Sequence, residues 1–475
     1  ASSLNDTPMS ERDDLDNPES ASPQTISLKE DHEFLRALLG HINAHEIFAS
    51  SDGTPRLAVI VFRCLLKWKA FSLERTSLFE RILQAFQNAL DQNKQNNQAM
   101  AFWLTNSFAL LHLLHRTLKQ NLNKDGKRKS IGIFDRINMT ISSRLKTSPH
   151  VFSSISGSSD KENEVGSKSH KNMDGNEESV TAIFGVKQIE AKYPGFLFRQ
   201  GLGAFCEKAY ETLRDNMKRM ITPNLGPCIQ APRQRTGAIV TSRNASGSGK
   251  RVGLNGIELS DHWQSVLDEL DALLSVFVGN HVPPALTLNF FTQTFCFINV
   301  NMFNALLLRR ECCSFSNGEY ILTGLSELEK WLVTNKKFVG EDPSKELRFI
   351  NQAVQLLVTH QKTRKSLNEI TLELCPVLSI QQLYRICTMY WDDKYGTETV
   401  NQDVLKQMKN SMMDNTNTQH NSFLLDDDSG VNLSLEEILG SSMEITLDFE
   451  SKSDLPEELS GNDAFEFLTT KLTAQ

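Results

Sequence analysis

The residues with the clearest capacity for chemistry are two adjacent carboxylates, Asp392 and Asp393. Paired carboxylates perform general acid–base catalysis when a second catalytic group faces them. These two follow a predicted helix end at Tyr390–Trp391, and the sequence shows no catalytic partner for them. The pair therefore predicts a solvated or salt-bridged turn, and we predict no catalytic residues.

A second candidate is Gly247–Lys250, which resembles the end of a phosphate-binding loop. Such loops have the form G-x-x-x-x-G-K-[ST] and follow a strand, and their backbone N–H groups and lysine surround the phosphates. Asn244 stands where the first glycine is needed, Arg251 stands where the hydroxyl residue is needed, and no strand precedes them. We interpret the stretch as a flexible loop and predict no nucleotide or other cofactor.

Two histidine pairs have a spacing that places both rings on one helix face: His41 with His45, and His112 with His115. A zinc site needs a third and usually a fourth ligand. Neither pair belongs to an H-E-x-x-H motif or has a cysteine or carboxylate ligand set nearby. Surface or capping histidines are the favoured interpretation, and no metal site is predicted.

The eight cysteines include no C-x-x-C pair, which argues against zinc ribbons and disulfide scaffolds. Cys312 and Cys313 are adjacent, but neighbouring cysteines rarely meet disulfide geometry, so a partly buried structural pair is expected. This cysteine usage fits a reducing compartment. We therefore expect a cytoplasmic protein.

Basic side chains in the C-terminal part allow two interpretations. The first is a solvated helix face, which is what most charge runs are. The second is a docking patch for an acidic peptide, an autoinhibitory partner or an anionic lipid surface. The candidate partner-binding residues are Arg309, Arg310, Lys362, Arg364, Lys365, Tyr384 and Arg385.

Composition limits the class of protein. The chain has 475 residues, 39% of them hydrophobic and 23% charged, which is enough for one large or two medium domains. A formal net charge of -8 argues against a nucleic-acid-binding protein whose affinity rests on a broadly basic surface, and leaves local basic patches open. Residues 1–17 are polar and hold no signal-peptide core, and the absence of an initiator Met suggests part of a longer chain.

One stretch, Leu286–Leu308, is apolar enough to raise the question of a membrane span. It contains five amide side chains that would be costly in hydrocarbon: Asn289, Gln293, Asn299, Asn301 and Asn304. A buried core helix is the better interpretation, so no transmembrane segment is predicted.

Apolar residues recur at helical spacing along most of the chain, and no convincing β alternation interrupts them. A capping box at Ser379 and Gln382 and the pair Pro283–Pro284 mark helix starts. Prolines at 223 and 227, with Gly226 between them, are expected to stop a helix. The predicted class is all-α, with helices over 34–42, 57–68, 78–90, 99–122, 135–145, 183–193, 196–221, 263–277 and several stretches between 284 and 390.

Composition shifts divide the chain into five parts. Residues 1–26 are a disordered linker, 27–232 an N-terminal helical subdomain with a disordered insertion at about 146–179, and 233–256 a flexible loop. Residues 257–413 form a C-terminal helical subdomain. An acidic, partly disordered tail follows over 414–475, with Phe423–Leu425 expected to contact the body and a short helix beginning at Ser434.

Several strings resemble one family. Phe291–Val300, Phe303–Tyr320, Ile380–Ile386 and Met389–Gly396 look like the dilute domain in the globular tail of myosins. Cys64–Trp68, the run from Leu110 to Lys119, and Cys228–Arg233 are similar to class XI myosins, the plant branch.

This resemblance implies two packed helical-bundle subdomains that bind cargo adaptor proteins or vesicle-associated small GTPases for transport along actin filaments. It also implies an alternative, an autoinhibitory domain that folds back on its own motor head. The resemblance does not extend to the family's ATPase head, I-Q neck or coiled coil. The sequence agrees, since it holds no phosphate loop, no complete I-Q repeat and no sustained heptads, so we expect that this chain does not hydrolyse ATP. The resemblance also implies a cytoplasmic location, on vesicles or organelles and on the actin cytoskeleton through partners.

Overall fold

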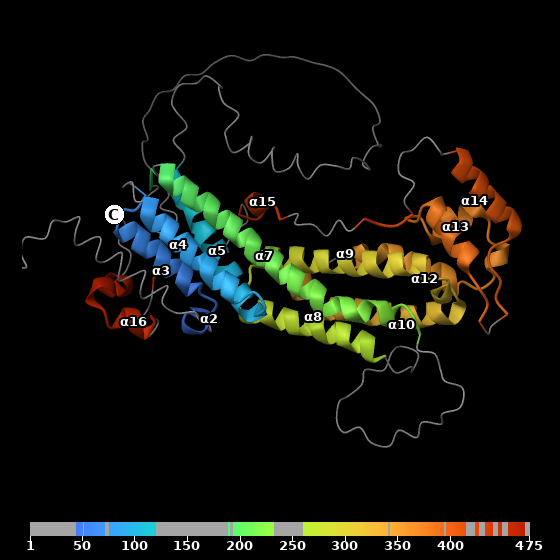
Figure 1. The fold of residues 1–475 in the computed structure, drawn as a ribbon, viewed down its shortest axis with the longest axis horizontal. Coiled ribbons are helices and arrows are strands. Elements are labelled where there is room, and N and C mark those ends of the chain that lie inside the picture. The colour runs from blue at the N-terminus through green and yellow to red at the C-terminus, as the bar shows by residue number, and fades with distance from the viewer. Residues whose placement is uncertain are drawn as a thin grey trace, which may run out of the picture.

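The computed structural model describes residues 44–50, 52–71, 76–119, 189–190, 193–231, 260–340, 343–393, 396–414, 423–426, 433–439, 445–448 and 455–470. These residues form an elongated body of helices with one group at each end (Figure 1). The predicted helix over 135–145, the insertion at 146–179 and the loop at 233–256 lie outside the described residues.

The N-terminal subdomain packs its helices around α5 (Asn97–Thr117). Asn96 caps this helix by accepting a hydrogen bond from the N–H of Ala99 at 3.2 Å. Residues on every side of α5 are buried, as expected of a helix inside a bundle. Around it lie α2 (Ala44–Ile47), α3 (Arg56–Lys67) and α4 (Thr76–Gln92).

A short parallel strand pair corrects the expectation of helix at residues 189–190, while residues 183–188 and 191–192 lie outside the described residues. β1 (Leu118–Lys119) pairs with β2 (Ile189–Glu190), with Leu118 opposite Ile189. Leu118 is buried beside the end of α5, so the pair closes this end of the bundle.

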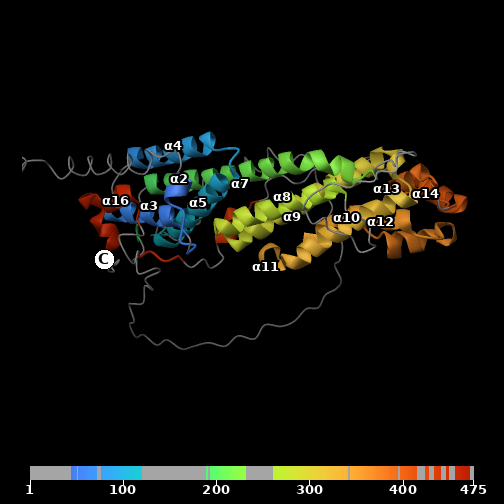
Figure 2. The same cartoon turned by 90° about the horizontal axis from the view of Figure 1, so that it is seen from below.

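Helix α7 (Tyr193–Cys228) joins the two subdomains. It contacts α4 and α5 at one end and α8 and α9 at the other, and Figures 1 and 2 both show it running along the body. The prediction that Pro223 and Pro227 stop the helix before residue 223 was wrong, because the helix continues to Cys228. Pro194 lies in its first turn, where the missing N–H costs nothing.

The C-terminal subdomain begins with α8 (Asp261–Gly279) and α9 (Pro284–Leu308). The expected capping box is present, since Ser379 and Gln382 exchange hydrogen bonds at the start of α13. The remaining elements are η2 (Arg310–Cys312), α10 (Phe315–Thr334), α11 (Lys336–Val339), η3 (Pro343–Leu347), α12 (Arg348–Val358), η4 (Lys362–Arg364), η5 (Glu369–Leu374), α13 (Ile380–Met389) and α14 (Gln402–Asp414).

Helix α9 is the core helix of this subdomain. Its length and composition alone would allow it to span a membrane, but most of it is buried inside the protein. Its polar side chains find partners there: Asn299 accepts the N–H of Ile350 at 3.0 Å, and Asn304 exchanges two hydrogen bonds with the backbone of Leu425. The aromatic residues expected in the core are all buried: Phe291, Phe295, Phe297 and Phe303.

The C-terminal tail returns along the molecule from α14 to the N-terminal subdomain (Figure 1). Phe423–Leu425 contact the body as predicted, because Gln382 donates to the Phe423 carbonyl at 3.0 Å beside the Asn304 contact. The predicted late helix is α15 (Leu435–Leu439). Beyond it, α16 (Glu457–Ser460) and η7 (Asp463–Thr469) lie next to α3 in Figures 1 and 2.

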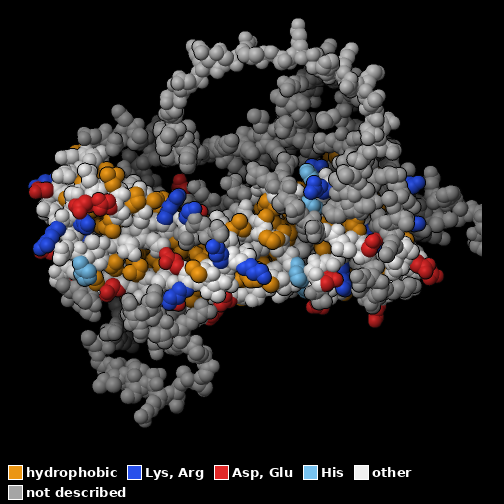
Figure 3. Space-filling view, turned by 180° about the vertical axis from the view of Figure 1, so that it is seen from behind, with side chains coloured by type: hydrophobic (Ala, Val, Ile, Leu, Met, Phe, Trp, Pro, Cys, Tyr) orange, Lys and Arg blue, Asp and Glu red, His pale blue; other side chains and the backbone are white. Residues whose placement is uncertain are grey.

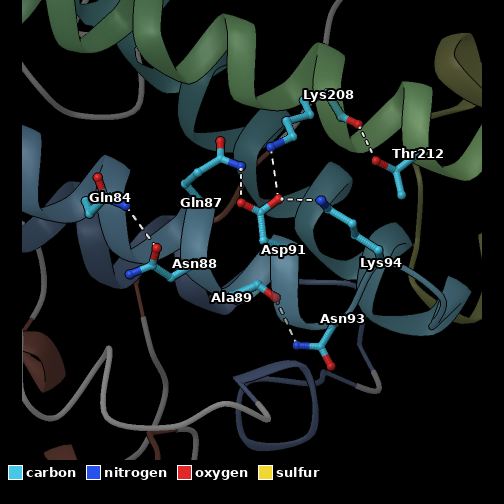
Figure 4. A network of polar contacts seen from close by, with 9 residues as sticks. All are labelled: Gln84, Gln87, Asn88, Ala89, Asp91, Asn93, Lys94, Lys208 and Thr212. Atoms are coloured by element: carbon cyan, nitrogen blue, oxygen red, sulfur yellow. Dashed lines mark hydrogen bonds and ion pairs between the residues drawn. The ribbon is translucent and has the colours of Figure 1, made fainter.

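A surface network joins the end of α4 to α7 (Figure 4). Asp91 accepts from Lys208 of α7 at 2.9 Å and from Gln87, and it pairs with Lys94 at 3.2 Å. These hydrogen bonds, chiefly the one from Lys208, lower the pKa of Asp91 to about 2. The ion pair between Asp91 and Lys208 is exposed, so it positions α4 against α7 and adds little to the free energy of unfolding.

The contact between α8 and α10 depends on Gly324. A Cβ atom at this position would lie 2.0 Å from the ring of Trp263, which is 1% exposed. Gly324→Ala is therefore expected to destabilise the protein by about 1–3 kcal/mol, the usual cost of an overpacked core. Urea unfolding followed by circular dichroism measures this change.

Gly203 in α7 provides the matched control, because nothing lies within 4 Å of its Cβ position. Gly203→Ala should raise stability by roughly 0.5–1 kcal/mol, since alanine is the better helix former. Equal stabilities for the two variants would contradict the close packing of Trp263 on α10.

Candidate docking surface at the end of the C-terminal subdomain

The end of α9 and the end of α13 are held together by Trp391. Its indole N–H donates to the Arg310 carbonyl at 3.1 Å, and its backbone N–H donates to the Cys313 carbonyl at 3.1 Å. Arg310 is exposed and Arg309 is half-buried. The structure thus brings these two predicted residues next to the helix that carries Tyr384 and Arg385.

Arg385 connects α13 to its surroundings at two points. Its Nε donates to the Leu307 carbonyl at 3.2 Å, and its guanidinium lies 5.5 Å from the centre of the Phe423 ring. A cation over an aromatic face is attracted by the ring's quadrupole. Arg385 as a whole residue is exposed, so it contacts the fold through Nε and the Phe423 ring and also lies at the surface.

An open groove of about 520 Å³ lies between α13 and α14 beside Arg385. Its apolar part comes from Phe423 and from two methionines of α14, of which Met413 is 58% exposed. Lys409 of α14 is exposed at the groove. Sequence reasoning missed Lys409, Met412 and Met413. The usable signal was a lysine followed by methionines three and four residues later, which places them on one helix face.

We use the name docking surface for Arg309, Arg310, Tyr384, Arg385, Lys409, Met412, Met413 and Phe423. Among the described residues, no carboxylate forms an ion pair with its arginines or with Lys409. Figure 3 views the molecule from behind and has this end on its left, where basic, acidic and hydrophobic side chains lie beside one another.

Lys362 does not belong to the exposed surface that the sequence suggested. Its side chain is 3% exposed, and its ammonium donates to the carbonyls of Leu357 and Thr359, each at 2.9 Å. It lies 4.2 Å from the centre of the Tyr390 ring. Burial lowers the pKa of Lys362 to about 8. Lys362 is therefore a buried residue that caps the carbonyls at the C-terminal end of α12.

Arg364 and Lys365 stay near the surface but interact within their own segment. Lys365 pairs with Glu369 at 3.3 Å, and Arg364 donates to the Gln361 side chain at 3.3 Å. Neither lines the groove. Their role in partner binding stays a prediction.

The other residues that the sequence offered as candidates for chemistry have roles in the fold. Asp393 accepts hydrogen bonds from Ser314 at 2.8 Å and from Ser316, while Asp392 accepts the backbone N–H groups of Gly396 and Thr397. The pair thus builds the turn after α13. His112 is fully buried and not at the surface as expected, because its helix is buried on all sides.

The cysteines are free thiols. Burial raises the pKa of Cys206, Cys313 and Cys387 to about 12 each, so these thiols stay protonated and weakly reactive. No cluster of three or more metal-ligating side chains occurs within the ranges that the structure describes. His41 and Gly247–Lys250 lie outside those ranges.

Comparisons with known sequences show similarity to a domain of myosins and to two plant myosins. Residues 289–394 match the DIL domain. Myosin-17 of Arabidopsis thaliana is 43% identical over 88% of this chain and 26% of its own length. Myosin-5 of the same plant is 41% identical over 96% of this chain and 28% of its own length. The chain spans about a quarter of the length of these relatives.

Solved structures show the same fold. The Myosin V cargo binding domain aligns with a TM-score of 0.59 at 12% identity, over 94% of this chain and 96% of that one. Myo2-GTD in complex with Mmr1 aligns with a TM-score of 0.56 at 13% identity, over 87% of this chain and 88% of that one.

The DIL domain and the two packed helical bundles fit one class of protein, the globular tail of a myosin. Within that class, the identities with the plant proteins fit a class XI myosin tail. The matched part of these relatives is their tail and not their motor head. The family resemblance and the all-α class are confirmed.

The buried position of Lys362 leads to a test. Lys362→Met keeps an unbranched side chain, one heavy atom shorter, but leaves the Leu357 and Thr359 carbonyls without their donor. We expect a loss of about 1–3 kcal/mol in the free energy of unfolding, because buried polar groups without partners are costly. Denaturant titration at pH 7 measures it.

Arg364→Met is the control, because Arg364 is exposed and should change stability by less than about 0.5 kcal/mol. If Lys362→Met were as stable as Arg364→Met, Lys362 would belong to the solvent-facing surface after all.

Proposed function

We propose that this chain is the cargo-binding tail of an actin-based class XI myosin, and that its docking surface binds an acidic, partly apolar segment of a cargo adaptor protein. The observation that carries the proposal is the position of Arg385 and Lys409 at the rim of a groove whose wall contains Met412 and Met413.

Charge supports an acidic partner. The whole chain has a net charge of -8, yet this surface presents three arginines and a lysine without a carboxylate pair among the described residues. Complementary charge speeds association and selects among partners more than it adds affinity. An acidic segment would therefore be guided to this end of the molecule.

The methionines support a partner with apolar side chains. Methionine is unbranched and polarizable, so it adapts to ligands of different shape and is frequent at surfaces that bind several partners. Met413 is 58% exposed, so much of its apolar side chain is accessible at the groove. A groove with this lining suits a family of adaptors that share chemistry and differ in sequence.

Related proteins give further support. Solved structures contain Myo2-GTD in complex with Mmr1, with Inp2 and with Smy1. Vesicle-associated small GTPases and a motor head are further predicted partners of this chain. Transport along actin and a place on vesicles or organelles in the cytoplasm follow from the same proposal. No described contact favours the autoinhibitory alternative.

Selection from a displayed peptide library on the full chain tests the proposal. The selected peptides should be rich in Asp or Glu and in large apolar residues. Arg385→Glu combined with Lys409→Glu should weaken each of them by about tenfold or more, because two attractive charges become repulsive. Fluorescence anisotropy with labelled peptides measures the dissociation constants.

Arg81→Glu on α4 is the control for a distant charge reversal, because Arg81 is exposed and lies on the other subdomain. It should change each dissociation constant by less than about twofold, as expected for a distant surface charge under salt screening. Peptides that bind the double variant as tightly as the parent would show that the groove is not the docking site.

A further inference from the structure

A second site lies at the opposite end of the molecule, on α3. This helix reads Arg56–Lys67 and is apolar over its central turns, except for Arg63. Arg63 is only 4% exposed. Burial lowers its pKa, yet an arginine at this depth remains charged and needs hydrogen-bond acceptors.

All the acceptors that the structure shows for Arg63 come from the C-terminal tail. Its guanidinium donates to the Leu447 carbonyl at 3.0 Å, the Phe467 carbonyl at 2.8 Å and the Thr470 carbonyl at 2.5 Å. Asp448 adds an ion pair at 3.8 Å and is half exposed. The N-terminal subdomain itself provides none of these partners, although it contains the arginine.

The tail binds this face as a peptide ligand binds its receptor. Three of the four contacts to Arg63 are main-chain carbonyls, and backbone contacts of this kind give affinity while side-chain pockets give specificity. Six apolar side chains of the tail are buried as well: Ile445, Leu447, Leu455, Leu459, Phe465 and Leu468. Lys67 of the same helix lies 5.7 Å from the centre of the Phe467 ring.

The C-terminal tail follows the C-terminal subdomain in the chain but contacts the N-terminal subdomain. Residues 423–426 pack on the C-terminal subdomain through Asn304 and Gln382, and residues 455–470 lie beside α3 at the other end of the body (Figure 1). The segment is therefore tethered at a distance, and its binding to α3 is an intramolecular association with a raised effective concentration.

We propose that the face of α3 around Arg63 is a peptide-recognition site, that residues 445–448 and 455–470 of this chain are its resident ligand, and that the part from residue 455 on dissociates and rebinds while both helical bundles stay folded. The site is separate from the docking surface and does not depend on the proposed cargo role.

The test uses the full chain with a specific protease site placed between residues 449 and 454. After cleavage, the piece that begins at Leu455 should still elute with the body in gel filtration. An excess of a labelled peptide of residues 455–470 should then replace it. The circular dichroism of the helices should not change during the exchange, apart from the small contribution of the piece itself.

Arg63→Gln should weaken binding of the labelled peptide by about tenfold or more, because it removes charge-assisted hydrogen bonds. A peptide with Leu468→Ala should lose a similar factor, since Leu468 is fully buried. A peptide with Glu466→Ala is the control and should bind within about twofold of the parent, because Glu466 is exposed. The peptide variants leave the body unaltered, so they stay informative if Arg63→Gln fails to fold.

Three results would overturn the proposal. One is a cleaved piece that the peptide never replaces while the body is folded. Another is loss of helical signal whenever the piece leaves, which would make the segment an integral part of the bundle. The third is equal binding of the parent and Leu468→Ala peptides.

Discussion

The constraint on which the rest of the structure depends is the continuity of α7. One helix of 36 residues contributes side chains to both bundles, so the two subdomains share a rigid element and not a linker. Its buried residues extend from Phe198 at one end to Leu225 and Cys228 at the other. Since the last turns contain two prolines, the helix must be held there by packing and not by backbone hydrogen bonding alone.

Approximate free energies show why the burial of side chains outweighs the cost of the two prolines. A proline in a helix interior costs about 3 kcal/mol, while full burial of an aliphatic side chain returns about 1.5–3 kcal/mol. Ile221 and Leu225 are at most 3% exposed, and Cys228 is fully buried. The same reasoning accounts for Asn317, which reaches across from α10 and donates to the Ile229 carbonyl at 2.7 Å just after the helix. The backbone just after α7 thus finds its hydrogen-bond partner in the C-terminal subdomain.

Sequence reasoning predicted the features that depend on local chemistry. The all-α class, the capping box at Ser379, the core aromatics of α9 and the docking of Phe423–Leu425 all follow from periodicity, capping preference or local hydrophobicity. The errors arose where tertiary contacts override local rules. Pro223 signals a helix end in isolation, and Lys362 signals exposure in isolation. The carbonyls that receive the Lys362 ammonium lie at the end of α12 and have no sequence signature.

The candidate site was predicted only in part, for the same reason. Tyr384 and Arg385 were found from the chain itself, whereas Lys409 and the α14 methionines join them through the fold. Arg63 was missed because a single arginine in an apolar helix gives no pattern, and its partners are separated from it by more than 380 positions. Both sites use arginine, but Arg385 is exposed, while the tail carbonyls accept from Arg63.

The central claim is that the groove between α13 and α14 is where an adaptor segment binds. Hydrogen–deuterium exchange of the full chain, measured with and without a selected acidic peptide, tests this claim most directly. The account predicts slower exchange in α13, α14 and residues 423–426, with little change in α3 to α5. Protection confined to the N-terminal subdomain, with α13 and α14 unchanged, would contradict it.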